Sequence, residues 1–348
     1  TVMDELKTLI FRTDRIGDFI ISCPFILSYK KKFKKTEIVT ISSEYNYDYI
    51  KNFKFIDEII PLKNEVKFFP KLFNLIKIIF LLRKNKFDHI IVLDGKNRSF
   101  FISLFLNGKK SILLQSRELE LFSKFFKYIS VINYELQNQL KNFSFLASKL
   151  NFDLNLKHIN IYKDYDFQNK ISFDKKYLMI HLDEKWYTKF YYRDFTDINP
   201  NPVQLEKLIN NILNSTNFEF DVILTTGSKK LDVLEQFTKD FTLIEKNFYE
   251  KKKDKNSIFF IKDTSFNDLE YLVKHSSFLI CCEGGISHVS HNFKVSTVAF
   301  YEKNRLQHTK YWTGHMTKLS LYERKEMHDL IEDKKFYNLI SDKINLKN

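Results

Sequence analysis

Glycine is scarce in this sequence, and the scarcity removes several enzyme classes at once. The chain has 348 residues and only 7 glycines, none of them arranged as G-x-G-x-x-G. The standard dinucleotide fingerprint is therefore absent, which argues against an NAD or FAD enzyme. G-x-S-x-G, a P-loop and paired Cys-x-x-Cys are absent as well. Hydrolase, NTPase and zinc-module functions consequently lack support.

Cysteine is also rare. The three cysteines, Cys23, Cys281 and Cys282, all lie in apolar segments and have neither a disulfide framework nor metal-ligand spacing. We expect buried free thiols, as in a protein from a reducing compartment.

Long apolar runs are missing too. The longest, Leu72–Leu82, is interrupted by Asn74 and Lys77 and is too short to span a bilayer. The first apolar run follows the acidic Asp4 and Glu5, so we expect no signal peptide. These features predict a cytoplasmic protein that touches a membrane peripherally at most.

Positive charge is abundant. The 56 Lys and Arg outnumber the 43 Asp and Glu, giving a net charge of +13, which permits nucleic acid, an anionic membrane or a phosphorylated substrate as partner. The short basic runs Tyr29–Lys35 and Lys251–Lys255 are expected to be solvated helix ends or loops. Charge alone does not choose among these partners.

Strand-like and helix-like segments alternate along both halves of the chain, and 44% of the residues are hydrophobic. This pattern predicts two α/β lobes of Rossmann type with parallel sheets. The expected lobes are residues 1–160 and 175–324, followed by terminal helices in 325–348 that pack back across the lobes. The polar segment Asn151–Asp174 is expected to be the linker.

One stretch combines a buried strand, a glycine loop and a helix start. Phe278–Cys282 is a continuous apolar run, Gly284 and Gly285 follow it, and Ser287 is expected to cap the next helix. Backbone N–H groups at such a helix start favour an anion such as a diphosphate. An ordinary turn with glycines for geometry alone is the alternative.

A second candidate region lies near the start of the chain. Asp18 ends the loop R-T-D-R-I-G-D, where it either stabilises the N-terminus of a helix or acts as a general base. The residues Asp94, Lys96 and Arg98 follow the strand Phe87–Leu93, at the sheet edge where ligands bind, unless they form a plain solvated loop.

Two possible metal motifs are weak. Asp164-Tyr165-Asp166 has the form of a D-x-D metal motif, yet it lies in an irregular connection where a solvated loop is expected. His288 and His291 have i, i+3 spacing, but no third ligand is evident in the sequence, which favours a pair near a helix cap.

Three segments together resemble the glycosyltransferase family 9 heptosyltransferases, the ADP-heptose:lipopolysaccharide transferases of the two-lobed GT-B fold. They are Ile10–Pro24, His181–Trp186 and Leu272–His288, the last followed by V-S-T-V-A-F-Y at Val295–Tyr301. The resemblance covers nearly the whole chain. It implies a GT-B fold, with both parallel sheets facing a central cleft.

The resemblance also implies residue roles. Asp18 matches the proposed base and Lys185 the phosphate-facing lysine. The nucleotide side comprises Thr226, Gly227, Glu283, Gly284, Gly285, Ile286, Ser287 and His288. Candidates on the acceptor side are Arg12, Arg15, Gly17, Asp94, Lys96 and Arg98. Glu283 and Gly284 depart from the family motif, which has Asp followed by a hydroxyl residue.

The implied reaction is inverting and metal-independent transfer of a sugar, with no cofactor. ADP-heptose is the expected donor, and a lipopolysaccharide-type or other surface glycan is the expected acceptor. Peripheral contact with the anionic inner-membrane leaflet suits the positive charge. A UDP- or GDP-hexose donor on the same fold is one alternative. A basic nucleic-acid-binding protein is the other alternative, although we do not expect a nucleic acid as partner.

Overall fold

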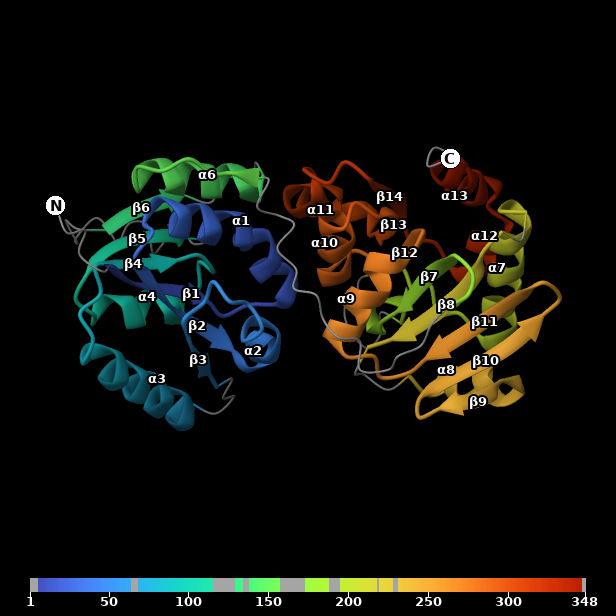
Figure 1. The fold of residues 1–348 in the computed structure, drawn as a ribbon, viewed down its shortest axis with the longest axis horizontal. Coiled ribbons are helices and arrows are strands. Elements are labelled where there is room, and N and C mark those ends of the chain that lie inside the picture. Colours follow the sequence, from blue (N-terminus) through green and yellow to red (C-terminus); the bar gives the residue numbers. More distant parts are fainter. Residues whose placement is uncertain are drawn as a thin grey trace. The chain divides into compact units, whose positions relative to one another are not determined.

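The computed structural model describes residues 6–63, 68–114, 129–133, 138–156, 173–187, 195–217, 219–227 and 231–345. The chain divides into two compact units, residues 1–164 and 165–348 (Figure 1). The boundary falls within the polar segment Asn151–Asp174. Asp164-Tyr165-Asp166 lies outside the described residues.

The first unit is built on one parallel sheet. Its strands are β1 (Leu6–Arg12), β2 (Thr36–Ser43), β3 (Glu58–Leu62), β4 (His89–Val92), β5 (Lys109–Leu114) and β6 (Ile129–Asn133). They are ordered β3-β2-β1-β4-β5-β6, and every neighbouring pair is parallel. In this doubly wound order, successive strands are added to one side of β1 as far as β3 and to the other side from β4 onward. The point between β1 and β4 where the order reverses is where such sheets bind ligands.

Helices cover both faces of this sheet because successive strand residues point to opposite sides. They are α1 (Ile16–Lys32), α2 (Glu44–Ile50), α3 (Phe68–Arg83), α4 (Asn97–Leu104) and α6 (Gln139–Lys149). Leu9 and Phe11 of β1 share a core with α3 and α4. Thr8, on the other face, meets the Tyr29 hydroxyl of α1 at 2.8 Å. The basic run Tyr29–Lys35 forms the last turn of α1 and the turn after it, as predicted.

The second unit has an eight-stranded sheet. Its strands are β7 (Tyr177–Leu182), β8 (Asp221–Thr226), β9 (Thr242–Glu245), β10 (Phe248–Lys253), β11 (Asn256–Ile261), β12 (Phe278–Cys282), β13 (Ser296–Tyr301) and β14 (Leu319–Glu323). The order is β14-β13-β12-β7-β8-β11-β10-β9, with only the pairs made by β10 antiparallel. The strand order reverses between the parallel neighbours β7 and β12.

The prediction of a helix end or loop for Lys251–Lys255 is wrong for Lys251–Lys253, whereas Asp254 and Lys255 do form a turn. Lys251–Lys253 belongs to β10, which forms a tight hairpin with β11 through Asp254, at φ 50°. The lysines are tolerated in the strand because two of them reach Glu206, at 3.1 Å from Lys251 and 3.9 Å from Lys253.

The helices of the second unit include the end of the chain. They are α7 (Pro202–Ser215), α8 (Asp232–Phe237), α9 (Phe266–His275), α10 (Gly285–Asn292), α11 (Leu306–Thr313), α12 (Met327–Glu332) and α13 (Lys334–Asn345), with short 3-10 turns such as η2 (Glu184–Trp186). Met327, Phe336 and Ile340 are buried in the same core as α7. The last two helices therefore complete this unit's core (Figure 1).

Two Rossmann-like α/β units are thus confirmed. Cys23, Cys281 and Cys282 are buried free thiols, also as predicted. Over the described part of the chain, no helix combines the length and the apolar character needed to cross a bilayer.

Candidate functional site

The first unit gathers polar side chains where β1 and β4 end. The loop after β1 runs from Thr13 to Arg15, and the loop after β4 contains Asp94 and Lys96. Since these strands flank the reversal point of the sheet, the two loops meet at its carboxyl edge. The sequence-predicted acceptor-side residues come from these loops, from the helix starts beside them or, for Arg12, from the last position of β1.

Arg12 is a structural element of this edge. Its side chain is 1% exposed; Nε donates to the Asp18 carbonyl at 2.8 Å and Nη1 to the Leu93 carbonyl at 2.8 Å. The guanidinium therefore ties the first turn of α1 to the end of β4.

Asp94 has a similar role. It is fully buried, and its Oδ2 accepts hydrogen bonds from the Thr13 hydroxyl at 2.6 Å and the Ser99 hydroxyl at 2.7 Å. Oδ1 accepts the Lys96 N–H at 3.1 Å across Gly95, which has a φ of 61°. A residue with a side chain rarely adopts that φ, so glycine suits this turn. Asp94 thus connects both loops through four donors, the fourth being the Thr13 N–H at 3.2 Å.

Asp18 lies at the third position of α1 and is half-buried. Its Oδ2 accepts the N–H of Arg15, the residue that precedes the helix, at 3.1 Å. This is the helix-stabilising contact considered from the sequence. Gly17 is buried in the same turn, whereas Arg15 is exposed.

Lys96 and Arg98 supply the cations of this edge. Lys96 Nζ donates to the Thr13 carbonyl at 3.0 Å, and Arg98 Nη2 donates to the same carbonyl at 2.9 Å. Both side chains are half-buried, and burial lowers the pKa of Lys96. Two cationic groups on one carbonyl still have further N–H donors for a polar ligand.

Asp14 was missed by the sequence reasoning. Its Oδ2 lies 3.2 Å from Arg12 Nη1, whereas its buried Oδ1 has no hydrogen-bond partner among the described residues. Burial, reinforced by the charges of Asp18 and Asp94, raises the Asp14 pKa to about 8. The available signal was a second acid in R-T-D-R-I-G-D, four residues before Asp18.

The second unit brings Lys185 and Glu283 together across 98 residues of sequence. Lys185 lies in η2 after β7, and Glu283 follows β12, the neighbouring strand at the reversal point. Lys185 Nζ donates to the Glu283 carbonyl. An ammonium group is therefore held beside the N-terminus of α10, where the helix dipole favours an anion.

The start of α10 corrects one prediction. Gly284, not Ser287, is the N-cap residue, and the helix begins at Gly285. Ser287 lies inside the first turn, where its hydroxyl accepts the Gly284 N–H at 3.2 Å and donates to the Gly284 carbonyl at 2.6 Å. Ile286, Ser287 and His288 are buried, so backbone groups and not their side chains form the surface of this turn.

Gly284 leaves room for the lysine. A Cβ built at this position would overlap Lys185 Nζ and lie 3.6 Å from its Cε. Glycine at position 284, where the family motif has a hydroxyl residue, therefore makes the space that the Lys185 ammonium group occupies. A hydroxyl residue at 284 would need Lys185 elsewhere.

Arg324 supports this arrangement and was not found from the sequence. It is 4% exposed; its Nη2 donates to the Lys185 carbonyl, its Nη1 to Cys282 Sγ at 3.3 Å and its Nε to the Thr196 carbonyl at 2.8 Å. Arg324 follows β14, a strand that the sequence reasoning did not predict. Its guanidinium fixes the η2 backbone against β12.

Burial shifts the pKa values of two titratable groups near Lys185, His181 and Asp183. Burial, with a smaller effect of the nearby Lys185 charge, lowers the His181 pKa to about 3, so this histidine is neutral near pH 7. Burial raises the Asp183 pKa to about 6, although its side chain accepts the Lys185 N–H at 3.0 Å. Lys185 consequently has a neutral imidazole in its surroundings.

His288 and His291 gain a neighbour that the sequence did not suggest. The His315 ring centroid lies 5.0 Å from that of His291 and 6.3 Å from that of His288. Within the described ranges, however, no three His, Cys, Asp or Glu side chains are arranged to hold a metal ion. Burial lowers the His315 pKa to about 4.

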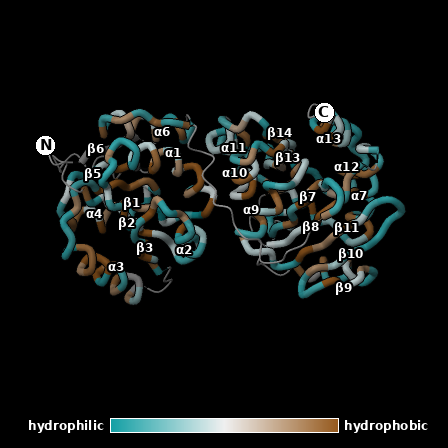
Figure 2. Tube along the Cα trace, viewed as in Figure 1, coloured by the Kyte–Doolittle hydropathy of each residue, from teal (hydrophilic) through white to brown (hydrophobic). Residues whose placement is uncertain are grey.

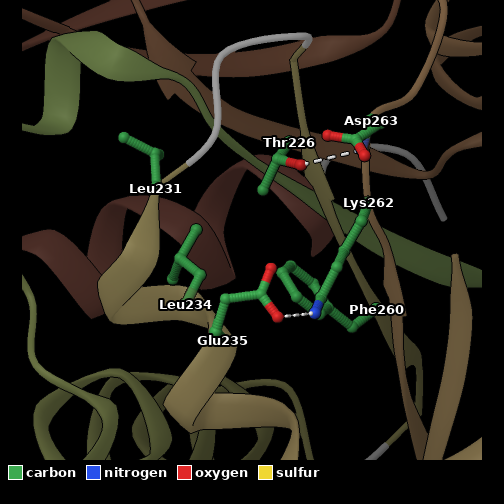
Figure 3. A pocket seen from close by; sticks show the side chains of 7 residues that line it. All are labelled: Thr226, Leu231, Leu234, Glu235, Phe260, Lys262 and Asp263. Carbon is green, nitrogen blue, oxygen red and sulfur yellow. Dashed lines mark hydrogen bonds and ion pairs between the residues drawn. The ribbon is translucent and has the colours of Figure 1, made fainter.

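A small pocket lies at the carboxyl ends of β8 and β11 (Figure 3). Its lining residues are Thr226, Leu231, Leu234, Glu235, Phe260, Lys262 and Asp263. Lys262 Nζ pairs with Glu235 at 2.7 Å, and Thr226 Oγ1 accepts the Asp263 N–H at 3.1 Å. A Cβ at the adjacent Gly227 would meet nothing within 4 Å, so the surface there is open.

Comparison with solved structures gives full-length matches. A heptosyltransferase of E. coli, WaaC, solved with ADP, aligns with a TM-score of 0.68 and 14% identity over 99% of this chain and all of that one. A family 9 glycosyltransferase from Veillonella parvula aligns at 0.71 and 12%, over 100% and 99%. UDP-GlcNAc 2-epimerase from Methanocaldococcus jannaschii aligns at 0.52 and 13%, over 97% and 92%.

No family model and no curated protein matches the sequence. The structural similarity, at these identities, concerns the fold. It covers both units. The chain therefore has the two-unit GT-B fold found in the family 9 glycosyltransferases, as the sequence predicted.

Proposed function

We propose that this protein is an inverting, metal-independent glycosyltransferase. It moves a sugar, heptose first among the candidates, from a nucleoside-diphosphate donor to a hydroxyl of a lipopolysaccharide-type or other surface glycan. The observation that carries the proposal is the Lys185 ammonium held at the start of α10. No metal ion or cofactor takes part.

The donor side follows from charge. Departure of a nucleoside diphosphate leaves negative charge on the phosphate oxygen, and a helix N-terminus with a fixed cation stabilises that charge. Lys185 and the backbone of Glu283–Gly285 provide both. The surface at Gly227, where an added Cβ would meet nothing within 4 Å, lies at the same sheet edge and is where the nucleoside binds in our proposal.

The acceptor side follows from proton balance. As the acceptor oxygen bonds to the anomeric carbon, the bond from that carbon to the diphosphate breaks and the hydroxyl proton must leave. The Asp18 carboxylate takes that proton in our proposal. Lys96 and Arg98 bind polar groups of the acceptor, whereas Arg12 and Asp94, being buried, act by holding the loops.

A nucleotide panel tests the donor site. We expect one of ADP, UDP, GDP and CDP, with ADP first, to stabilise the protein by about 2.7 kcal/mol at a hundredfold excess over its Kd. The measurement is the thermal unfolding temperature at a fixed protein concentration. A preference for UDP or GDP would select the alternative hexose donor.

No shift with any of the four nucleotides would contradict the donor site. Salt-dependent binding to a DNA duplex or to RNA, without a nucleotide response, would instead support the basic nucleic-acid-binding alternative.

Gly284→Ala provides a steric test of the phosphate site. The new methyl group would displace the Lys185 ammonium, whose flexible stem can move away, so the fold survives while the cation is lost from the helix start. We expect about tenfold weaker binding of the stabilising nucleotide, since one charge-assisted hydrogen bond is lost. Isothermal titration calorimetry measures it.

Lys185→Met is the matched comparison because it removes the charge and keeps the stem. If both substitutions act through the same ammonium group, the double variant should bind no more weakly than either single variant. Additive losses would show that Gly284 acts on the nucleotide independently of Lys185.

A further inference from the structure

Helix α3 presents an apolar stripe to solvent. Phe69 is 80% exposed, Phe73 68% and Phe80 64%, and Leu72 and Ile76 are more than two-fifths exposed. The spacing of these positions, three or four residues, places all five on one side of the helix. Figure 2 shows the hydrophobic character of α3.

The opposite side of α3 is already committed to the core. Leu82 is fully buried, and Leu75, Ile78 and Ile79 pack against the first unit's core. An ordinary surface helix would be polar on its outer side. Here both sides are apolar, so the exposed stripe is not explained by folding of the first unit.

Helix α4 adds to this apolar surface. It packs beside α3; Phe101 of α4 is 46% exposed, and Phe105, the residue that caps its C-terminal end, is 57% exposed. These two residues are four apart and share one side of the helix. Contiguous exposed apolar surface of this kind marks an interaction site.

The charged residues of α3 and of the segment that directly follows it are positive. Residues 68–87 contain no Asp or Glu, and Lys77, Arg83, Lys84 and Lys86 are exposed. A second copy of the chain would bring like charges together, whereas an anionic lipid surface complements them. The positive charge therefore favours an anionic lipid surface over a second copy of the chain as the partner.

We propose that α3 docks in the interface of an anionic phospholipid bilayer. Phe69, Phe73 and Phe80 enter the boundary between headgroups and acyl chains, while Lys77 and Arg83 reach the lipid phosphates. The helix lies in the plane of the surface and does not cross it. This inference stands apart from the donor site and needs no nucleotide.

Vesicle co-sedimentation of the full chain tests the proposal. We expect binding to vesicles containing about 30% phosphatidylglycerol at about 0.1 M salt, weaker binding at about 0.5 M, and little binding to pure phosphatidylcholine. The triple variant F69S/F73S/F80S should lose about tenfold or more of the binding. The variant K77E/R83E/K84E should lose a similar share by reversing the charge.

The control variant V203S/L243S/I244S changes three exposed apolar residues of the second unit and should bind vesicles like the wild type. Circular dichroism and an unchanged thermal unfolding curve confirm that the variants are folded. Equal binding by F69S/F73S/F80S, or equal binding to neutral vesicles, would overturn the proposal. A concentration-dependent dimer that the triple variant abolishes, without vesicle binding, would assign the stripe to a second copy and overturn it too.

Discussion

Replacing Asp18 with asparagine is expected to lower sugar transfer by about a hundredfold to ten-thousandfold, because the acceptor loses its general base. Asparagine keeps an oxygen that can still accept the Arg15 N–H, so the cap of α1 should survive. Nucleotide binding should stay unchanged, since the proposed donor residues belong to the second unit. Product formation under saturating donor, together with the nucleotide thermal shift, measures both effects.

The control is Asp48→Asn, the same change at a carboxylate on α2 that is 82% exposed. It should leave transfer unchanged. Asp14 offers the competing assignment, because it lies four residues before Asp18 and one of its oxygens is buried without a hydrogen-bond partner among the described residues. Transfer near the wild-type rate in Asp18→Asn, combined with loss in Asp14→Asn, would move the role of base to Asp14.

Replacing Asp94 with alanine is expected to destabilise the first unit by about 3 kcal/mol or more. The N–H groups of Thr13 and Lys96 would lose their buried acceptor, and each unsatisfied group costs about 1–3 kcal/mol. Amide hydrogen exchange in β1 and β4 should accelerate by about a hundredfold, because local opening becomes easier. Mass spectrometry of peptides from those strands measures this.

The second unit provides an internal reference. Both tryptophans, Trp186 and Trp312, lie there, so their fluorescence reports unfolding of that unit. We expect that signal to be unchanged in Asp94→Ala. Asp48→Ala removes an exposed carboxylate and should change stability by less than about 0.5 kcal/mol. Unchanged exchange in β1 and β4 would show that Asp94 is not needed to join the loops.

Much of the architecture could be read from the sequence because it depends on local signals. The strand Phe278–Cys282 has the predicted bounds, and the predicted alternation of strands and helices is present in both halves of the chain. Apolar spacing and capping residues set these elements independently of distant contacts. β10 was missed because its F-Y-E-K-K-K sequence resembles a loop, and its strand conformation depends on pairing with β11.

The functional roles of buried polar residues depended on the tertiary structure. Arg12 and Asp94 looked like ligand-binding residues, since charged side chains at a strand end usually face solvent or a ligand. Only the folded unit shows the carbonyls and hydroxyls that occupy them. Arg324 gave no sequence signal, because its partners, which are backbone carbonyls, the Cys282 sulfur and the Glu302 carboxylate, come from distant segments.

The sequence by itself determined the α/β class and the glycine loop before α10, since periodicity and residue type suffice for those. The order of the strands decided the rest. It placed β7 beside β12, and so brought Lys185 to the Glu283 carbonyl over a glycine too small to exclude it. Such a contact between segments 98 residues apart depends on sheet pairing, and no local pattern encodes it.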